Sequence, residues 1–189
     1  ANGWRFDNCF VTNSLCTPSR ASILTGTYSH VNGVYSLFTP IDSSQPTFIS
    51  QLRDAGYRTA MIGKWHMGHG DGHDPEGFDY WDVLPGQGDY WDPTFISPEG
   101  RRTVEGYATD IITDLAIDWV ESLEGDDPWC MLVWHKAPHR PWEPKPEHRD
   151  LFADLLKQGF VRARVDGKIV RLGDDLRLDR QMRHMIEVV

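Results

Sequence analysis

The sequence predicts an α/β fold in which helices flank a mostly parallel sheet. Predicted helices alternate with short apolar strands through the first 134 of the 189 residues, and this order is typical of parallel α/β sheets. Polar residues also cluster directly after the strands, which is where open α/β sheets place their ligand crevice. A chain of this length can bury a core of its own. We therefore expect an α/β domain with a site at the carboxyl edge of its sheet.

Four elements are expected in the first third of the chain. Pro18 suits the first turn of a helix, because a residue without an N–H leaves no hydrogen bond unmade there. Pro46 lies near the start of a second helix, and Gly56 follows its end. The predicted elements are a strand over residues 6–11, a helix over 18–26, a helix over 46–55 and a strand over 57–62.

Three further segments are expected between residues 68 and 134. Apolar residues that include Val104, Ile111 and Leu115 recur at helical spacing, which makes the helix of this region the clearest element of the chain. A stretch rich in Gly, Asp and Trp precedes it without periodicity, and a short apolar run follows it. The predicted segments are an irregular loop over 68–92, a helix over 103–123 and a buried strand over 128–134.

The composition changes near residue 150. The first 150 residues carry a net charge of −11, whereas the remainder carries +2 and holds no proline or tryptophan. This remainder predicts a helix over 151–158 and then a β-hairpin whose two-residue turn is Asp166-Gly167. Two unlike segments, 1–149 and 150–189, are therefore expected.

Composition also argues against several classes of protein. The net charge of −9 argues against a general nucleic-acid binder, so no nucleic-acid partner is expected. No apolar run reaches the length of a membrane span, and the first ten residues lack the layout of a signal peptide. The spacing of the three cysteines matches no zinc pattern.

The segment Cys16-Thr17-Pro18-Ser19-Arg20 predicts an anion site. With Pro18 in the first turn, the side chain at position 16 lies at a helix N-terminus, where free N–H groups and the helix dipole favour negative charge. Arg20 follows about one turn later and provides a forked, permanently charged donor. The alternative is that Cys16 is a small buried residue and Arg20 a surface charge.

Lys64 and His66 follow the strand predicted over 57–62. This is the edge at which α/β sheets bind ligands, so the ammonium and the imidazole are expected to face the same site as Cys16. The alternative is that both side chains lie at a solvated strand end.

Two segments resemble the signatures of the type I sulfatases, the formylglycine-dependent members of the alkaline phosphatase superfamily. Residues 13–26 (NSLCTPSRASILTG) resemble the first signature, and residues 56–66 (GYRTAMIGKWH) resemble the second. The similarity continues through residues 85–90 and 135–142 and covers about residues 1–149. It implies a partial alkaline-phosphatase-like fold and the hydrolysis of a sulfuric ester.

The resemblance implies a role for each residue of the two signatures. Cys16 matches the cysteine that the family oxidises to formylglycine, whose hydrated aldehyde attacks sulfur and later expels sulfate. Splitting one difficult step into two is the general logic of covalent catalysis. By the same match, Arg20 holds the hydrated aldehyde, Lys64 binds the sulfuryl oxygens, and His66 acts as the base.

Two residues near the end of the resemblance are further candidates. His139 matches a family histidine that binds sulfate near the leaving oxygen and can protonate it, and the alternative is a structural loop histidine. Lys136 is a weaker candidate for substrate binding, since a simple surface lysine explains it as well.

The resemblance also implies a Ca²⁺ ion. The family holds it between an Asp-Asp pair, an Asp-Asn pair and the formylglycine, and of these ligands the sequence contains only position 16. Hard divalent cations need several oxygen ligands, so the 189-residue chain is expected to have no appreciable sulfatase activity. Asp71, His73 and Asp74 form a second acidic group, which a polar loop explains better.

Substrate and partners follow from the resemblance alone. Residues 86–90 and several tryptophans resemble sulfatases that act on sulfated glycans, which implies a glycan or small-molecule sulfate ester as substrate. A formylglycine-generating enzyme or an anaerobic sulfatase-maturating enzyme is the implied partner, and the periplasm or the cell exterior is the implied location. The alternatives are a phosphonate or phosphate monoester hydrolase of the same superfamily, and a catalytically inactive truncated chimera.

The chimera is suggested by residues 159–189, which resemble a segment of the bacterial excinuclease A subunit without its nucleotide-binding motifs. The join is expected within residues 146–153. The alternative is a divergent insertion in a sulfatase.

Overall fold

The computed structural model describes residues 5–145, 157, 159, 162–171 and 186–188. The chain divides into two compact units, Ala1–Lys136 and Ala137–Val189. Each unit is described by itself below.

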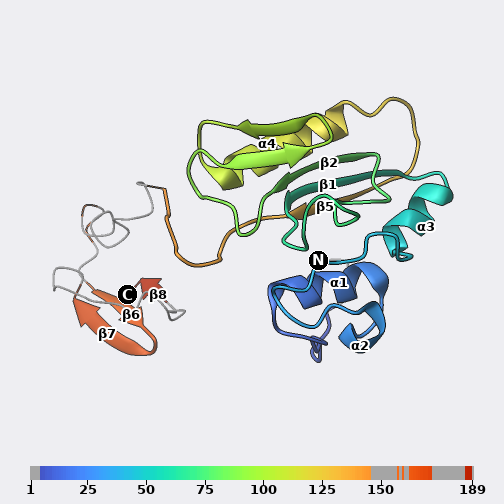
Figure 1. The fold of residues 1–189 in the computed structure, drawn as a ribbon. Coiled ribbons are helices and arrows are strands. Elements are labelled where there is room, and N and C mark those ends of the chain that lie inside the picture. The colour runs from blue at the N-terminus through green and yellow to red at the C-terminus, as the bar shows by residue number, and fades with distance from the viewer. Residues whose placement is uncertain (1–4, 146–156, 158, 160–161, 172–185, 189) are drawn as a thin grey trace. The chain divides into compact units, whose positions relative to one another are not determined.

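A five-stranded sheet in the order β4-β3-β2-β1-β5 forms the centre of the first unit (Figure 1). Strand β1 pairs in parallel with β2 on one side and with β5 on the other, whereas β3 and β4 form an antiparallel hairpin. This arrangement confirms the predicted mostly parallel α/β class. The strands are β1 (Arg58–Lys64), β2 (Tyr80–Leu84), β3 (Thr94–Ser97), β4 (Gly100–Thr103) and β5 (Trp129–Trp134).

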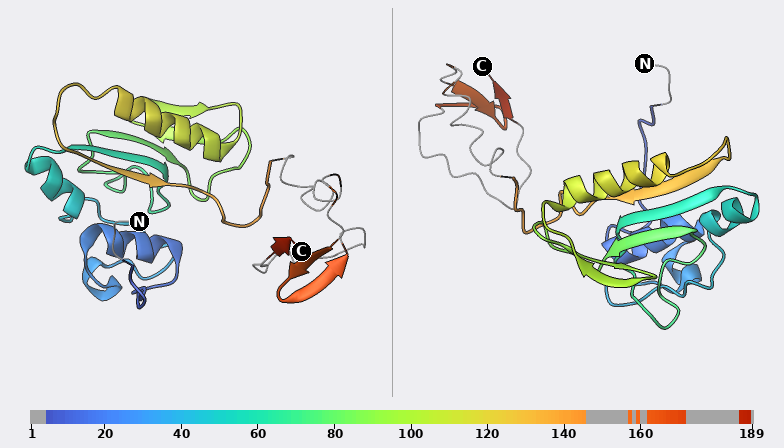
Figure 2. Two further views of the ribbon diagram at one scale, coloured as in Figure 1. Left: turned by 180° about the vertical axis from the view of Figure 1, so that it is seen from behind. Right: turned by 90° about the horizontal axis from the view of Figure 1, so that it is seen from above.

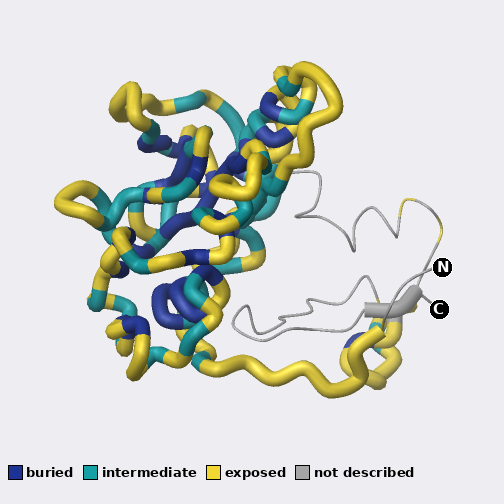
Figure 3. The backbone as a smooth tube through the Cα atoms, turned by 90° about the vertical axis from the view of Figure 1, so that its right-hand side faces the viewer, coloured by how far each residue is buried: buried dark blue, intermediate teal, exposed yellow. Residues whose placement is uncertain are grey.

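Helices cover both faces of this sheet (Figures 1 and 2). Alternate side chains of β1 point to opposite faces, so Met61 packs with α1 and α3 whereas Ile62 packs with α4. Buried residues run along β1 and the second half of β2, and others lie in the helices (Figure 3). Among the described residues, no helix is both long and apolar enough to cross a bilayer. The helices are α1 (Cys16–Thr25), α2 (Ser29–Asn32), α3 (Phe48–Asp54) and α4 (Ala108–Glu121).

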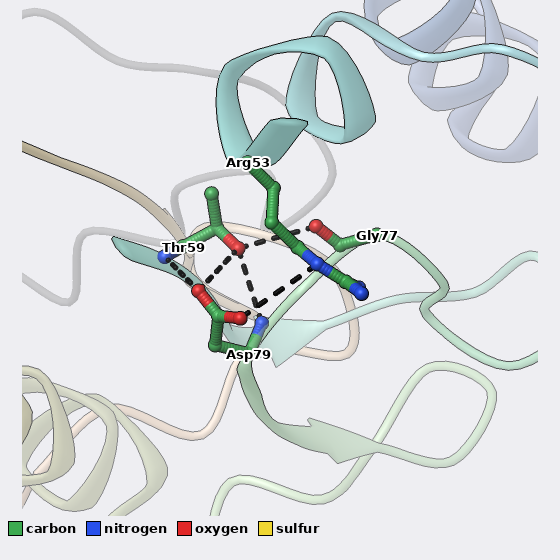
Figure 4. Close-up of polar contacts among 4 residues, drawn as sticks. All are labelled: Arg53, Thr59, Gly77 and Asp79. Atoms are coloured by element: carbon green, nitrogen blue, oxygen red, sulfur yellow. Dashed lines mark hydrogen bonds and ion pairs between the residues drawn. The ribbon is translucent and has the colours of Figure 1, made fainter. Parts of the chain in front are cut away.

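Polar contacts fix the start of β2 against β1 (Figure 4). The backbone N–H of Thr59 donates to Asp79 Oδ2 over 2.9 Å, and the N–H of Asp79 donates to the Thr59 carbonyl oxygen over 3.0 Å. Thr59 Oγ1 donates to the Gly77 carbonyl oxygen over 3.1 Å, and Arg53 Nε lies 3.8 Å from Asp79 Oδ1. These contacts set the register that brings the carboxyl ends of both strands to one edge.

Residues 6–11 form no strand, so that prediction is wrong. Phe6, Phe10 and Val11 are exposed, and within the described part of the chain no strand pairs with this segment. A β-strand forms by hydrogen bonding to a neighbouring strand, whereas the exposed backbone of residues 6–11 can bond to water instead, so the apolar residues of this segment do not by themselves make a strand.

The loop predicted over 68–92 is wrong in part, because β2 lies within it. Asp82 interrupts the apolar pattern of this five-residue strand, although its carboxylate is only 1% exposed. Arg102 of β4 donates to both carboxylate oxygens of Asp82. This ion pair joins β2 to the β3–β4 hairpin. That hairpin was not predicted from the sequence. A strand that contains a buried charge is not recognised from hydropathy, because burial of a charge is unusual without a partner.

The other predicted elements are confirmed with shifted ends. The helices expected over 18–26 and 46–55 are α1 and α3, and the strand expected over 57–62 is β1, which extends to Lys64. The helix expected over 103–123 begins only at Ala108, because Thr103 belongs to β4. Strand β5 is confirmed, but it lies at the edge of the sheet and is half-buried rather than buried.

The second unit holds a three-stranded sheet in the order β7-β6-β8. Asp166 and Gly167 both have positive φ, as the predicted two-residue hairpin turn requires. The helix predicted over 151–158 and the join predicted within 146–153 lie outside the described residues, except for Lys157. The strands are β6 (Arg162–Val165), β7 (Lys168–Arg171) and β8 (Ile186–Val188).

Gly63 places the end of β1 against β5. Its φ is +101°, and a Cβ built at this position would lie 2.3 Å from the carbonyl oxygen of Trp134. That contact is with backbone, which cannot turn aside as a side chain can. The position therefore needs glycine both for its conformation and for the close approach of β5.

We expect Gly63→Ala to lower the free energy of unfolding by about 3 kcal/mol or more, since it combines left-handed strain with a backbone clash. Gly125→Ala is the matched control, because Gly125 has φ +79° but open space where its Cβ would lie. That change is expected to cost about 1 kcal/mol. Urea denaturation of both variants measures the difference, and equal losses would contradict the assigned role of the β5 contact.

Candidate active site

Cys16 is the first residue of α1, at the positive end of a ten-residue helix. Leu15 caps the helix in an extended conformation, and its N–H donates to Asn13 Oδ1 over 3.1 Å. Pro18 lies in the first turn, as predicted, and Gly26 ends the helix with a left-handed φ of 65°. The half-buried Cys16 side chain is therefore presented where an anion is favoured.

The Lys64 ammonium lies beside Cys16. The lysine is the last residue of β1 and only 2% exposed. Its Nζ lies 3.7 Å from Cys16 Sγ and 2.5 Å from Gln87 Oε1. Burial lowers the pKa of Lys64, and the positive charges of Arg20 and Lys136 lower it further against an opposing effect of Cys16. The site thus holds a buried amine whose charge water does little to stabilise.

Arg20 joins α1 to two strands. Its Nη1 donates to the carbonyl oxygen of Lys64 over 2.7 Å, and its guanidinium carbon lies 4.6 Å from the ring centre of Trp134 in β5. Burial lowers the pKa of Arg20 to about 10, against an opposing effect of Cys16. The alternative of a surface charge is therefore wrong, because the guanidinium is held inside the junction of helix and sheet.

His66 lies two residues beyond β1, with a positive φ of 54°. Its carbonyl oxygen accepts a hydrogen bond of 2.7 Å from Oγ1 of Thr17, the buried second residue of α1. The backbone that carries His66 is thus fastened directly next to Cys16. Its action as a base stays a prediction.

Lys136 follows β5 and is only 5% exposed, so the alternative of a surface lysine is wrong. Its Nζ donates to the backbone carbonyl oxygen of Gln87 over 3.2 Å and lies 4.6 Å from the ring centre of Tyr90. Gln87 therefore contacts both Lys64 and Lys136. No sequence pattern singled out this glutamine, although the segment 85–90 that contains it is part of the family resemblance.

His139 belongs to the second unit, outside the unit that holds the other candidates. Its Nδ1 lies 2.5 Å from the carbonyl oxygen of Arg140. Its contact with sulfate stays a prediction.

A calcium site is not formed by the residues that the structure describes. Among them no group of three or more His, Cys, Asp or Glu side chains could hold a metal ion. His73 Nδ1 lies 2.5 Å from the Ile41 carbonyl oxygen, and Asp74 accepts from the N–H of Gly70. These contacts agree with the interpretation of residues 71–74 as a polar loop. The cation in contact with Cys16 is Lys64, and the positive charges of Arg20 and Lys136 both act on Lys64. This concentration of positive charge suits an anion with several oxygens.

Two family models match the chain. The model described as Sulfatase matches residues 1–157, and the model described as UvrA interaction domain matches residues 141–189. The second match agrees with the resemblance of the tail to excinuclease A.

The relatives at higher identity are sulfatases. The chain is 50% identical over 158 residues to the N-acetylglucosamine-6-O-sulfatase of Bacteroides thetaiotaomicron, a match that covers 82% of this chain and 27% of the relative. It is 30% identical over 175 residues to human N-acetylglucosamine-6-sulfatase, a match that covers 82% of this chain and 32% of the relative. The chain thus spans about a third or less of the length of these relatives.

A solved structure gives the same likeness in three dimensions. It has a TM-score of 0.74 and 48% sequence identity, and the match covers 79% of this chain and 30% of the other. That structure is described as a complex with its substrate, D-glucosamine-2-N,6-O-disulfate. The described fold and the Sulfatase family model therefore agree on the first unit.

The buried charge of Lys64 is expected to reduce stability at neutral pH. Lys64→Met should raise the free energy of unfolding at pH 7 by about 1 kcal/mol, because it removes a desolvated cation that repels its neighbours. The variant also removes the donor to Gln87 Oε1, but Gln87 is only half-buried, so this oxygen can accept a hydrogen bond from water instead.

The sign of the pH dependence follows from the lowered pKa of Lys64. Between that pKa and the ordinary value of 10.5, the unfolded chain holds a proton that the folded chain has lost. Wild-type stability therefore rises with pH there, and the advantage of Lys64→Met shrinks. Urea denaturation at pH 7 and 10 measures this, with the exposed Lys168→Met as a control that should show no such change. A Lys64→Met variant that is less stable than wild type at pH 7 would contradict the conclusion that the buried charge of Lys64 destabilises the fold.

Proposed function

Because this chain belongs to the sulfatase family, we propose that residues 1–149 are part of a catalytic domain that cleaves sulfate esters of a glycan. The observation that carries the proposal is the 3.7 Å contact between the Lys64 ammonium and Cys16 Sγ at the N-terminus of α1. A negatively charged, tetrahedral group at position 16 would meet this ammonium and the positive end of the helix together.

Cys16 is proposed as the residue that becomes formylglycine. When present, the hydrated aldehyde supplies an oxygen nucleophile that attacks sulfur. An unmodified thiol at position 16 would not supply that oxygen. The proposal is supported by the position of residue 16, whose Sγ lies 3.7 Å from Lys64 Nζ at the start of α1. A formylglycine-generating or anaerobic sulfatase-maturating enzyme is the partner this proposal requires.

The other residues serve binding and proton transfer. Lys64 would bind the sulfuryl oxygens and stabilise the negative charge that grows on them, since its compact ammonium is already desolvated. Arg20 would hold the hydroxyl groups at position 16, and Lys136 would add a further positive charge. His66 would act as the base and His139 as the acid for the leaving oxygen. No step is assigned to Ca²⁺, because the described residues do not form its site.

The substrate proposed is a glycan that carries a 6-O-sulfated glucosamine. The relative at 50% identity is named for N-acetylglucosamine-6-O-sulfatase activity, and the structure at 48% identity is described with a 6-O-sulfated glucosamine. A location outside the cytoplasm is supported by a Caenorhabditis elegans relative, 27% identical, that is named a putative extracellular sulfatase.

Residues 150–189 are proposed to be a segment unrelated to the sulfatase. Three boundaries fall close together: the units divide after Lys136, the second family match begins at residue 141, and the first ends at residue 157. A continuous sulfatase reading frame in genomic DNA across codons 140–160 would overturn this proposal. A junction there would support it.

Co-expression with a formylglycine-generating enzyme is expected to convert Cys16 to the aldehyde. Mass spectrometry of the peptide that spans residue 16 measures the conversion, and derivatisation with a hydrazide confirms the carbonyl group. Cys9 and Cys130 serve as internal controls, because neither is followed by proline and arginine at the signature spacing, and both should stay thiols. An intact thiol at position 16 in every preparation would contradict the proposed nucleophile.

A further inference from the structure

We propose that Gln87 is a positioning residue, whose neutral amide oxygen holds the Lys64 ammonium beside residue 16 and leaves the positive charge of that ammonium available to the substrate. The inference rests on the proposed function of the site and assigns a role to a residue outside both sulfatase signatures. It follows from three features of the structure: the rigidity of the turn that carries Gln87, its contacts with two lysines, and the neutrality of its oxygens.

The turn that carries Gln87 is fixed against the end of β2. The N–H of Gly88 donates to the carbonyl oxygen of Pro85 over 2.9 Å, which closes a four-residue turn. Gly88 has a φ of +65°, and a Cβ at that position would lie 2.7 Å from Cδ1 of Leu84. Leu84 is itself fully buried in the core against α4. The backbone of Gln87 is thus held by the sheet and not by a loose loop.

Gln87 holds the two lysines through two different oxygens. Its side-chain Oε1 lies 2.5 Å from Lys64 Nζ, and its backbone carbonyl oxygen accepts from Lys136 Nζ over 3.2 Å. The lysine side chain is a flexible four-carbon stem that needs such acceptors to take one position. Because one residue provides both acceptors, the two ammonium groups are held by the backbone and the side chain of a single turn residue.

Both oxygens of Gln87 are neutral, which decides how much charge the site keeps. The hydrogen-bond partners found for Lys64 Nζ in the described residues are Cys16 Sγ and Gln87 Oε1, and neither is a carboxylate. A glutamate at position 87 could orient the ammonium equally well, but its charge would cancel that of the lysine. An amide gives orientation without neutralisation, which is what a site for an anionic ester requires.

The charge at the site can be measured through the unmodified Cys16 thiol. Iodoacetate and iodoacetamide alkylate thiols by the same chemistry, but iodoacetate carries a negative charge, so the ratio of their rates reports the local potential. The 189-residue chain is expressed without a maturating enzyme, and peptide mass spectrometry gives the rate at each cysteine. Cys9 is exposed and serves as the reference in the same molecule.

In the wild type, the iodoacetate-to-iodoacetamide ratio should be higher at Cys16 than at Cys9. Gln87→Glu should lower the ratio at Cys16 by about three- to tenfold, which is the effect of one added charge at a distance of several ångströms in a half-buried site. Gln87→Met, which keeps the size but removes the acceptor, should lower it by a smaller factor because Lys64 is no longer held. Neither variant should change the ratio at Cys9.

Gln51→Glu is the matched control, since it places the same charge on the exposed surface of α3. It should leave the ratio at Cys16 unchanged, and near-ultraviolet circular dichroism should show that all three variants keep the wild-type packing. An unchanged ratio at Cys16 in a folded Gln87→Glu variant would overturn the inference. This outcome is distinct from failure of the proposed function, which would appear as a residue 16 that no maturating enzyme oxidises.

Discussion

The hydrogen bond from Arg20 to the carbonyl oxygen of Lys64 is the constraint on which the site depends. It links the first turns of α1 to the last residue of β1, two segments that are more than forty positions apart in the sequence. The ring of Trp134 in β5 packs against the same guanidinium. The Arg20 side chain therefore connects α1 with the parallel strands β1 and β5. A guanidinium suits this role because it remains charged when buried and can donate in several directions at once.

The arrangement places charge where burial makes it costly. Lys64 is 2% exposed and Lys136 5% exposed, and the positive charges of Arg20 and Lys136 both act on Lys64. Like charges of this kind destabilise a fold unless something offsets them. The contacts that partly offset these charges include neutral groups: a backbone carbonyl, a glutamine amide, a thiol and an aromatic face. The partners found for Lys64 Nζ in the described residues are a thiol and an amide oxygen, so no carboxylate among them cancels the charge of that ammonium.

The elements that could be predicted from sequence are those with a local cause. Pro18 lies in the first turn of α1, Gly26 ends that helix, and the Asp166-Gly167 turn closes the hairpin, because each residue has a conformational preference that acts on its own neighbours. Strand β2 could not be predicted in this way, because Asp82 breaks its apolar pattern and its partner Arg102 lies twenty residues away. The pairing of Asp82 with Arg102 is seen only in the tertiary structure, because no short stretch of sequence contains both residues. The same division applies to the site: Cys16, Arg20 and Lys64 could be proposed from two signatures, whereas only the distances show that Gln87 contacts two lysines.

The negative net charge of the chain does not conflict with the proposed anionic substrate, because solvent screens surface charges more strongly than buried ones. The net charge of the chain is −9, and among the described residues the buried charged side chains are Lys64, Asp82 and Lys136. The other described charges are more exposed, and salt screens a surface charge within about 8 Å at physiological ionic strength. Lys64, which contacts Cys16, is buried, so its field acts on a group at that position through protein and not through bulk water. A sulfate ester that reaches position 16 would therefore meet mainly the local positive charge. The surface charge would act on the approach of the substrate, and the buried lysines would determine how firmly it is held.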